Sequence, residues 1–329
     1  MPLFLRFFGA RLARTATILA AVAALSFTLA SFSPIDPVDA YMGPRILTIG
    51  PGQRELIAER WGLHQPPLVR FAKWAGNLLS GDFGQSLIYN EPVSQVIAKR
   101  FRTSLWLMGC AWTLSGLLGY ALGIFAGLFR DSPFDRATRL YAYVLASTPA
   151  FWIGLVLLSI FSVSLGWTPI CCAAPPGLTA ENVGLGQRIH HLILPALTLS
   201  VIGVAQITLH VREKMLDVMQ SEYALYAKAM GETRWGFVTG HALRATALPA
   251  LTVQFASLGE LFGGSVLAEQ VFSYPGLGKA TVEAGLRGDI PLLLGVAIFS
   301  ALFVCAGNMI ADALYFAVDP RIRAGEATA

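Results

Sequence analysis

The chain has 329 residues, of which 55% are hydrophobic and only 13% are charged, and its mean hydropathy is +0.59. Soluble domains carry about 25% charged residues, so this composition excludes an ordinary water-soluble fold. The formal net charge of +4 is too small to indicate a nucleic-acid-binding protein. The composition therefore predicts a polytopic membrane protein.

Long apolar stretches predict about six transmembrane helices, because each reaches or approaches the roughly 20 residues needed to cross a bilayer core. The predicted spans are Thr15–Phe32, Ser104–Phe129, Leu140–Trp167, Leu192–Val211, Leu248–Ala268 and Leu292–Val318. The first span follows a basic stretch and could be a signal peptide. Its apolar run is long and no small-x-small cleavage site closely follows it, so an uncleaved anchor is expected.

The positions of the basic residues predict the orientation. All 24 Lys and Arg residues fall between the predicted spans. With a cytoplasmic N-terminus, thirteen of them lie in short inside segments, and only Arg188, Lys279 and Arg287 lie in the two short outside segments. The positive-inside rule therefore places both termini in the cytoplasm, since loops longer than about 60 residues, such as Ser33–Thr103, escape the rule.

Four segments lie outside the predicted membrane spans. They are Ser33–Thr103, Thr168–His191 and Glu269–Pro291 on the outside, and Arg212–Ala247 in the cytoplasm. Amphipathic stretches predict surface helices at Arg54–Trp61 and Leu68–Leu79, and Tyr274-Pro275-Gly276 predicts a turn.

Metal and enzyme signatures are weak or missing. Cys171 and Cys172 are adjacent, and neighbouring cysteines rarely meet the geometry of a disulfide. With His190 and His191 they could contact a soft metal, but no recognised ligand spacing supports this, and loop residues are the simpler interpretation. The segment Gly276–Thr281 lacks the first glycine and the Ser or Thr of a phosphate loop. We therefore expect no metal site and no catalytic residues.

The most specific motif lies in the cytoplasmic segment, which contains Glu222-Tyr-Ala-Leu-Tyr-Ala-Lys-Ala-Met-Gly231 and later Leu248-Pro249. This sequence resembles the permeases of bacterial ABC importers, in particular the dipeptide, oligopeptide and nickel family. Leu225 and Tyr226 depart from the general ABC motif in a way that is usual in that branch. The resemblance implies that a short helix, a glycine turn and Leu-Pro opening the next span dock on an ATPase subunit. The residues assigned to this ATPase coupling are Glu222, Tyr223, Tyr226, Ala227, Lys228 and Gly231.

Further phrases extend the resemblance over nearly the whole chain. They are Gly62–Pro66, Leu79–Ser86, Glu269–Gly278, Asn308–Asp312 and Asp319–Arg323. The resemblance implies an all-α type I ABC importer permease fold in the bacterial inner membrane. Its expected parts are an N-terminal helix with an outside segment (1–103), a five-helix core with coupling loop 212–247 (104–318), and a cytoplasmic tail (319–329).

The resemblance also implies partners and a substrate class. We expect a homologous second permease, two ABC ATPase subunits that use ATP and Mg, and an extracytoplasmic binding protein, with no cofactor bound by this chain. The phrases Gly259–Gly264 and Met215–Val218 look more like the nickel and metal-chelate members than the peptide members. An ion-coupled secondary transporter is the alternative, although it would be expected to show inverted repeats, which are not seen.

Acidic residues remain inside two predicted spans. Ionisable groups within a membrane are functional candidates by default, and we assign Glu260 and Gln254 to the translocation pathway. Gly259 and Gly263 form a small-xxx-small face for helix packing. Asn308 and Asp312 lie one turn apart and are assigned to interhelical packing.

Overall fold

The computed structural model describes residues 2–32, 38, 51–60, 64–175, 177–178 and 183–318. These residues form helices and no β-strand beyond a bridge between Gln85 and Pro92. The predicted tail 319–329, with its phrase Asp319–Arg323, lies outside the described residues.

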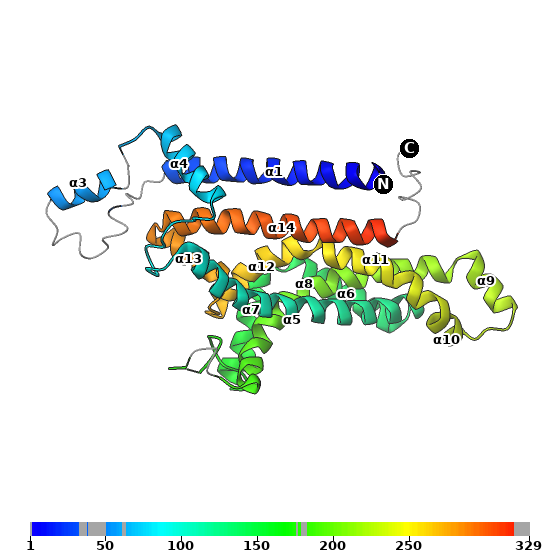
Figure 1. Cartoon of the computed structure of the whole chain (residues 1–329). Helices are drawn as coiled ribbons and strands as arrows, with labels where there is room; N and C mark the ends of the chain where they lie inside the picture. Colours follow the sequence, from blue (N-terminus) through cyan, green and yellow to red (C-terminus); the bar gives the residue numbers. More distant parts are fainter. Residues whose placement is uncertain are drawn as a thin grey trace. The chain divides into compact units, whose positions relative to one another are not determined.

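The helices run through the chain as follows (Figure 1). They are α1 (Pro2–Ser31), α3 (Pro51–Arg60), α4 (Pro67–Leu79), α5 (Val93–Leu128), α6 (Pro133–Ser147), α7 (Ala150–Leu157), η2 (Leu158–Ser164), α8 (Leu185–Met219), α9 (Glu222–Ala229), α10 (Arg234–Phe237), η4 (Val238–Ala242), α11 (Leu243–Ala256), α12 (Leu258–Val271), α13 (Leu277–Arg287) and α14 (Ile290–Val318). The two surface helices expected between the first spans are thus present as α3 and α4.

In the part of the chain that the structure describes, four helices are long and apolar enough to cross a membrane: Arg11–Ser31, Val93–Leu128, Leu185–Met219 and Ile290–Ala313. Two bent pairs raise the number to six if each pair is one span. Pro133–Ser147 and Ala150–Ser164 meet at 107°, and Arg234–Ala256 and Leu258–Val271 meet at 52°. The all-helical fold with about six spans is therefore confirmed.

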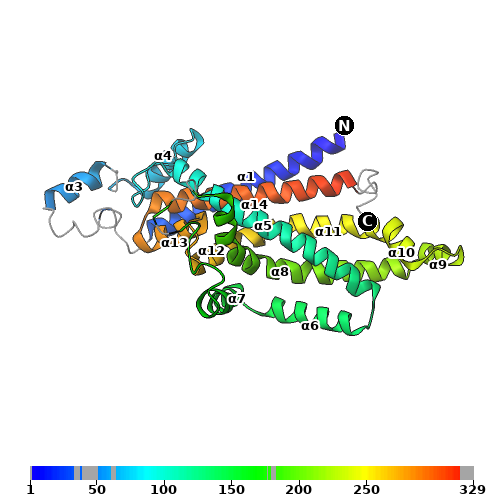
Figure 2. The same cartoon turned by 90° about the horizontal axis from the view of Figure 1, so that it is seen from below.

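A proline accounts for the first bend, whereas other prolines do not end their helices. Pro149 lacks an amide hydrogen and restricts the residue before it, and Thr148 is extended with ψ 131°, so α6 ends there and α7 turns away (Figure 2). Pro195 and Pro249, by contrast, lie inside α8 and α11. Helix α11 thus starts upstream of Leu248-Pro249, and the expectation that these two residues open a membrane span stays a prediction.

The long helices also extend beyond the apolar stretches that predicted them. Lys99, Arg100 and Arg102 lie in α5, and Arg212 and Lys214 lie in α8. The expectation that no basic residue falls inside a membrane helix was therefore wrong. An apolar window finds the part of a helix that crosses lipid, and the helix continues past it.

The chain divides into two compact units, of which unit 1 comprises Met1–Thr103 and Gly276–Cys305. Within unit 1, the Asp289 carboxylate is fully buried just before α14. Its Oδ1 accepts a hydrogen bond from the Leu292 amide at 3.1 Å, and its Oδ2 accepts from the Ser86 hydroxyl at 2.6 Å and from the Ile88 amide at 3.1 Å. This carboxylate caps a helix and holds the end of the Leu79–Ser86 phrase.

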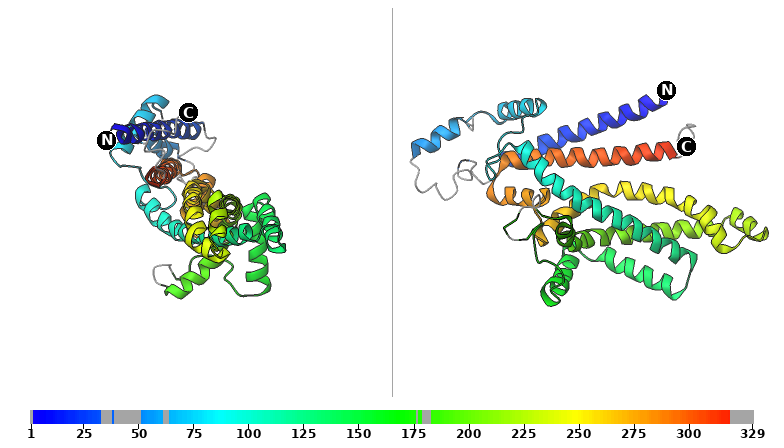
Figure 3. Two further views of the ribbon diagram at one scale, coloured as in Figure 1. Left: turned by 90° about the vertical axis from the view of Figure 1, so that its right-hand side faces the viewer. Right: turned by 60° about the horizontal axis from the view of Figure 1, so that its bottom comes forward.

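Unit 2 comprises Ser104–Pro275 and Ala306–Ala329. Helix α8 lies at its centre, in contact with α6, α7, α11 and α12. Helices α9 and α10 extend past the ends of α8 and α11 at one end of this unit (Figures 1 and 3). The predicted coupling helix α9 therefore lies at the end of unit 2 that follows α8 and precedes α11.

Candidate functional site

Helix α9 exposes most of the residues predicted to couple to an ATPase. Its N-cap is Ser221, whose hydroxyl accepts a hydrogen bond from the Ala224 amide. Glu222, Tyr223, Tyr226, Lys228 and Gly231 are all exposed, whereas Ala227 is half-buried. Leu225 and Met230 add apolar surface, with exposures of 70% and 71%. A soluble surface rarely collects so many large apolar groups on one short helix, so this face is suited to a protein partner.

Gly231 ends α9 in a conformation that favours glycine. Its φ is +81°, and its amide donates to the Lys228 carbonyl at 3.1 Å while the Glu232 amide donates to the Ala227 carbonyl at 3.0 Å. These two bonds form the Schellman motif, in which the left-handed residue is usually glycine. A Cβ at Gly231 would meet no atom of the described residues within 4 Å. The turn therefore needs glycine for its backbone, and any close approach would come from another molecule.

The opposite face of α9 packs on the interior of unit 2. Ala224 belongs to a buried cluster that also contains Leu128 of α5, Met215 of α8 and Phe237 of α10, and Ala227 packs against that cluster. Small residues at 224 and 227 let the helix sit close to this core. A force on the exposed face of α9 would thus reach α5 and α8 through direct contacts.

Helix α10 is fastened to the end of α5. The Arg234 guanidinium donates a hydrogen bond to the Leu128 carbonyl and lies over the Phe129 ring, 5.5 Å from its centroid. Trp235 makes edge contacts with the rings of Phe125 and Phe129, each at 6.4 Å. Carbonyls at a helix end have no partner within the helix, and Arg234 supplies one here.

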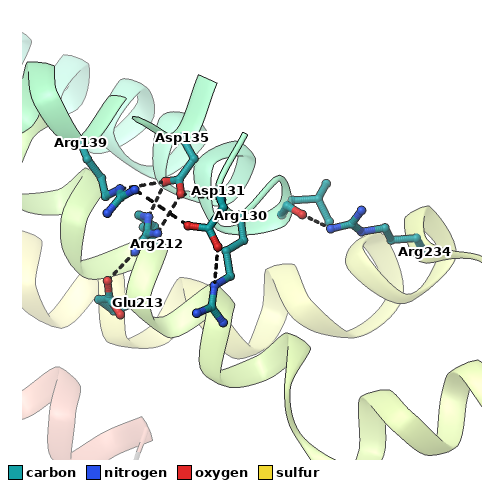
Figure 4. A network of polar contacts seen from close by, with 8 residues as sticks. Arg130, Asp131, Asp135, Arg139, Arg212, Glu213 and Arg234 are labelled. Carbon is teal, nitrogen blue, oxygen red and sulfur yellow. Dashed lines mark hydrogen bonds and ion pairs between the residues drawn. The ribbon is translucent and has the colours of Figure 1, made fainter. Parts of the chain in front are cut away.

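A buried ion pair joins α6 and α8 close to this segment (Figure 4). Arg212 Nε lies 2.5 Å from Asp135 Oδ1, and the second guanidinium arm donates to Asp135 Oδ2 at 2.9 Å. Asp135 is fully buried and Arg212 is 6% exposed. The Asp131 amide also donates to Asp135, and Arg139 lies 3.6 Å away. In the sequence, Arg212 indicated only the orientation of the chain, because no local pattern links residues 77 positions apart.

Glu260 lies in the first turn of α12 with its side chain exposed. The Gln206 amide of α8 donates to both carboxylate oxygens, at 3.1 and 3.2 Å. An ionised carboxylate left against lipid costs several kcal/mol. In the assembled protein this surface is therefore expected to meet water or another polar chain, as the predicted pathway role requires.

Gln254, by contrast, is 4% exposed. Its amide nitrogen donates to the Trp112 carbonyl at 2.5 Å and lies 3.3 Å from the Ser115 hydroxyl, while the Trp112 indole donates to the Gln254 carbonyl at 3.0 Å. These contacts hold α11 against α5. Such burial does not fit the exposure to a pathway that was predicted for Gln254.

Close packing between α5 and α8 involves glycines that were not singled out in the sequence. A Cβ on Gly119, Gly123 or Gly127 of α5 would lie 2.6 to 2.8 Å from a side chain of α8. Their spacing of four residues is the small-xxx-small pattern, so the sequence did hold this signal. At Gly263 a Cβ would meet nothing within 4 Å, and Gly259 is half-buried. Among the described residues no close neighbour of Gly263 is therefore seen, and the packing role predicted for Gly259 and Gly263 stays a prediction.

The second predicted packing pair lies on α14. Asn308 is exposed and Asp312 is half-buried. The neighbouring Gly307 approaches Leu258 of α12, since a Cβ there would lie 3.2 Å from Leu258 Cδ1. The predicted hydrogen bonding of Asn308 and Asp312 to another helix stays a prediction.

Glu269 lies inside a helix, although the sequence predicted it to begin an outside segment. Glu269 belongs to α12, is fully buried, and accepts a hydrogen bond from the Ser104 hydroxyl at 2.5 Å. Its carbonyl accepts from the Tyr274 amide at 2.8 Å, which closes the end of α12 just before the predicted turn. Burial raises the pKa of Tyr274 to about 12, so this phenol stays protonated. The Glu269–Gly278 phrase is thus the end of a helix and the buried turn that follows it.

The adjacent cysteines also differ from expectation, because the structure joins Cys171 and Cys172 in a disulfide. Cys172 has a positive φ of 76°, and its amide donates to the Phe272 carbonyl at 2.9 Å. The unusual backbone and this anchor give the pair a conformation that sequence reasoning treated as improbable. His191 Nδ1 lies 3.1 Å from the Cys171 carbonyl oxygen, and His190 Nε2 lies 2.8 Å from that of Trp167.

Known proteins resemble this chain over nearly its full length. The oligopeptide transport system permease protein AppB of Bacillus subtilis is 36% identical over 308 residues, which cover 93% of this chain and 95% of AppB. The di/tripeptide transport system permease protein DppB of Pseudomonas aeruginosa is 34% identical, covering 92% of this chain and 94% of DppB. A putative peptide transport system permease protein of Brucella abortus is 34% identical over 95% of this chain.

The family model for the binding-protein-dependent transport system inner membrane component matches residues 119–324. That range contains the exposed helix α9, the Gly231 turn and Glu260. It confirms the resemblance seen in the sequence, and none of the relatives described above is named for nickel. The chain belongs to the family of binding-protein-dependent transport system inner membrane components, and it is a multi-pass, non-catalytic permease subunit of an ABC importer in the inner membrane.

Proposed function

We propose that this permease forms half of the translocation pathway for dipeptides or oligopeptides. The observation that carries the proposal is the set of relatives named for peptide transport, each aligned with more than nine-tenths of this chain. The sequence phrases that favoured nickel and metal-chelate substrates have no such support. The sequence left two substrate classes open, peptides and nickel or metal chelates, and we therefore prefer peptides.

Glu260 is the residue we assign to the pathway. An exposed carboxylate held by Gln206 would attract the protonated amino terminus of a peptide. Gln206 contributes neutral amide donors and no positive charge, so the site would keep its attraction for a cation. The competing role is a polar contact with the second permease subunit.

The proposed complex contains a homologous permease, two ATPase subunits and an extracytoplasmic binding protein. The exposed face of α9 would dock on an ATPase, with Tyr223 and Tyr226 as aromatic anchors of the kind that dominate interfaces. ATP and Mg would be used by the ATPases, and this chain would bind no cofactor itself.

Reconstitution tests the proposal. The permease would be purified with its co-expressed partners, placed in liposomes, and assayed for uptake of a labelled dipeptide, a labelled pentapeptide and radioactive nickel. Peptide uptake should require ATP and the binding protein, and it should survive an ionophore that removes ion gradients. Uptake of nickel but of neither peptide would overturn the substrate assignment. Gradient-driven uptake by this chain alone would instead indicate a secondary transporter.

A further inference from the structure

The amphipathic helix α4 has three distinct faces and contains no fully buried residue. Successive residues are turned by about 100° in an α-helix, which places Phe71, Trp74 and Leu78 on one face. Arg70, Lys73 and Asn77 form a polar face. Leu68, Ala72 and Leu79 form a third face, called here the open apolar face. Leu68 is 81% exposed and Leu79 is 90% exposed.

The first of these faces fixes α4 against the end of α1 (Figure 1). The Phe27 ring of α1 lies 5.3 Å from the Phe71 ring and 5.8 Å from the Trp74 ring, centroid to centroid. Phe71 and Trp74 are themselves 6.0 Å apart. Three mutually packed aromatic rings therefore hold the two helices together within unit 1.

The contact with α1 determines the depth of α4 in the membrane. The span Arg11–Ser31 ends four residues after Phe27, which is about 6 Å along a helix axis. Leu25, Leu29 and Phe32, which lie at the same level on the side turned away from Phe27, are 62%, 64% and 83% exposed, as expected of a surface that faces lipid. A helix packed on Phe27 therefore lies level with the last turn of a membrane span, where hydrocarbon gives way to headgroups.

We propose that α4 is an interfacial helix that lies in the lipid headgroup layer where α1 leaves the bilayer, on the side that the charge count assigns to the outside. Its open apolar face continues the lipid-facing surface of α1 and enters the boundary of the acyl chains. Amphipathic helices of this kind bury their apolar face about 5–10 Å into that boundary. Trp74 lies at the depth where Trp is enriched in membrane proteins.

The charges of α4 agree with a position in the lipid headgroup layer. Arg70 and Lys73 are the ionisable residues of the helix, and both are basic. Lys73 is exposed and donates to Gln65 at 2.8 Å, and it lies on the polar face rather than the open apolar face of Leu79. Long basic side chains at such positions reach the lipid phosphates while the apolar face enters the bilayer. The lipid surface thus accounts for both the apolar and the polar face.

Fluorescent probes test the proposal in the assembled importer in liposomes. In a transport-competent background without native cysteines, Leu68→Cys, Leu79→Cys and the matched control Asn77→Cys would each carry an environment-sensitive dye. Nitroxides attached near the top of the lipid acyl chains should quench the dyes at 68 and 79 at least threefold more than the dye at 77. Aqueous iodide should show the reverse order.

Two outcomes would overturn the proposal. Iodide quenching at 68 and 79 equal to that at 77, without lipid quenching, would place α4 in water. Shielding of 68 and 79 from both quenchers would mean that a protein covers the open apolar face.

A second measurement needs no cysteine-free background. A photo-reactive benzoylphenylalanine at position 68 should give lipid adducts in native membranes, detected by mass spectrometry, whereas adducts confined to the binding protein or the second permease would reject the lipid assignment.

Discussion

Replacing Arg212 with Met tests whether the Asp135–Arg212 pair stabilises unit 2. The change keeps a long, flexible side chain of similar reach in α8 but removes the guanidinium that holds the Asp135 carboxylate at 2.5 and 2.9 Å. Asp135 would then keep one backbone donor, the Asp131 amide at 2.9 Å, and the more distant Arg139 at 3.6 Å. A fully buried carboxylate would be left without its principal partner.

Breaking a buried pair in this way costs about 3–5 kcal/mol, because the remaining charge is uncompensated. Since Arg139 and the Asp131 amide remain, we expect a loss near 3 kcal/mol in the free energy of unfolding. The double variant Asp135→Asn/Arg212→Met removes both charges and should recover more than half of that loss. Glu213→Gln removes the charge of the other acidic partner of Arg212, and because Glu213 is 68% exposed it should cost about 0–1 kcal/mol.

Unfolding in mixed micelles of increasing denaturing detergent would give the free energies, with circular dichroism following the helices. Uptake measured on the same preparations would show whether the surviving protein still transports. If Arg212→Met cost no more than Glu213→Gln, or if the double variant were as unstable as Arg212→Met, the pair would not have the role inferred from its burial.

Three further changes test other parts of the chain. Gly123→Ala should destabilise the protein by about 1–3 kcal/mol, because the new Cβ would lie 2.7 Å from Val211 Cβ and 2.8 Å from the Thr208 carbonyl. The control Gly109→Ala should be tolerated, since a Cβ there would meet none of the described residues within 4 Å. Equal stabilities of the two variants would contradict the packing of α5 on α8. Gly231→Val should lower transport-linked ATP hydrolysis at normal membrane insertion, since the left-handed conformation costs an L-residue roughly 1–2 kcal/mol. Gly231→Asn, which tolerates that conformation, should retain more activity than the Val variant, and an unchanged rate in the Val variant would remove the coupling role. Glu260→Gln should assemble normally but take up peptide poorly, whereas a lower complex yield would indicate a structural contact and normal assembly with full uptake would exclude both roles.

The sequence predicted membrane helices well where hydrophobicity alone decides the structure. The expected span Leu292–Val318 lies within α14, and the expected Leu68–Leu79 is α4 less its first proline. The third span was predicted as one helix although Thr148-Pro149 marked the break. No comparable signal marked the 52° bend near Ser257, because that bend depends on how α11 and α12 pack on α8.

Contacts between distant residues were beyond the reach of local patterns. Gln254 and Glu260 are both polar residues in one apolar stretch, and only the position of Trp112 makes the first a buried link and leaves the second exposed. The prediction that Glu269 lies in an outside segment was wrong for a similar reason. A buried carboxylate is acceptable inside a helix when a partner such as the Ser104 hydroxyl lies opposite, and that partner is far away in sequence.

The glycines show what this separation of sequence and contact implies for assembly. Gly119, Gly123 and Gly127 have the same spacing pattern as Gly259 and Gly263, and a pattern alone cannot say which set has a neighbour. Side chains of α8 pack directly against the three glycines of α5. Gly263, by contrast, lies exposed beside Glu260 and the 45% exposed Leu267. A glycine-bearing face with a carboxylate, left open by its own chain, would be costly against lipid. If a second permease subunit packed on this face of α12, the face would both join the two subunits and line the pathway between them. Assembly and uptake must therefore be measured together in the Glu260→Gln variant.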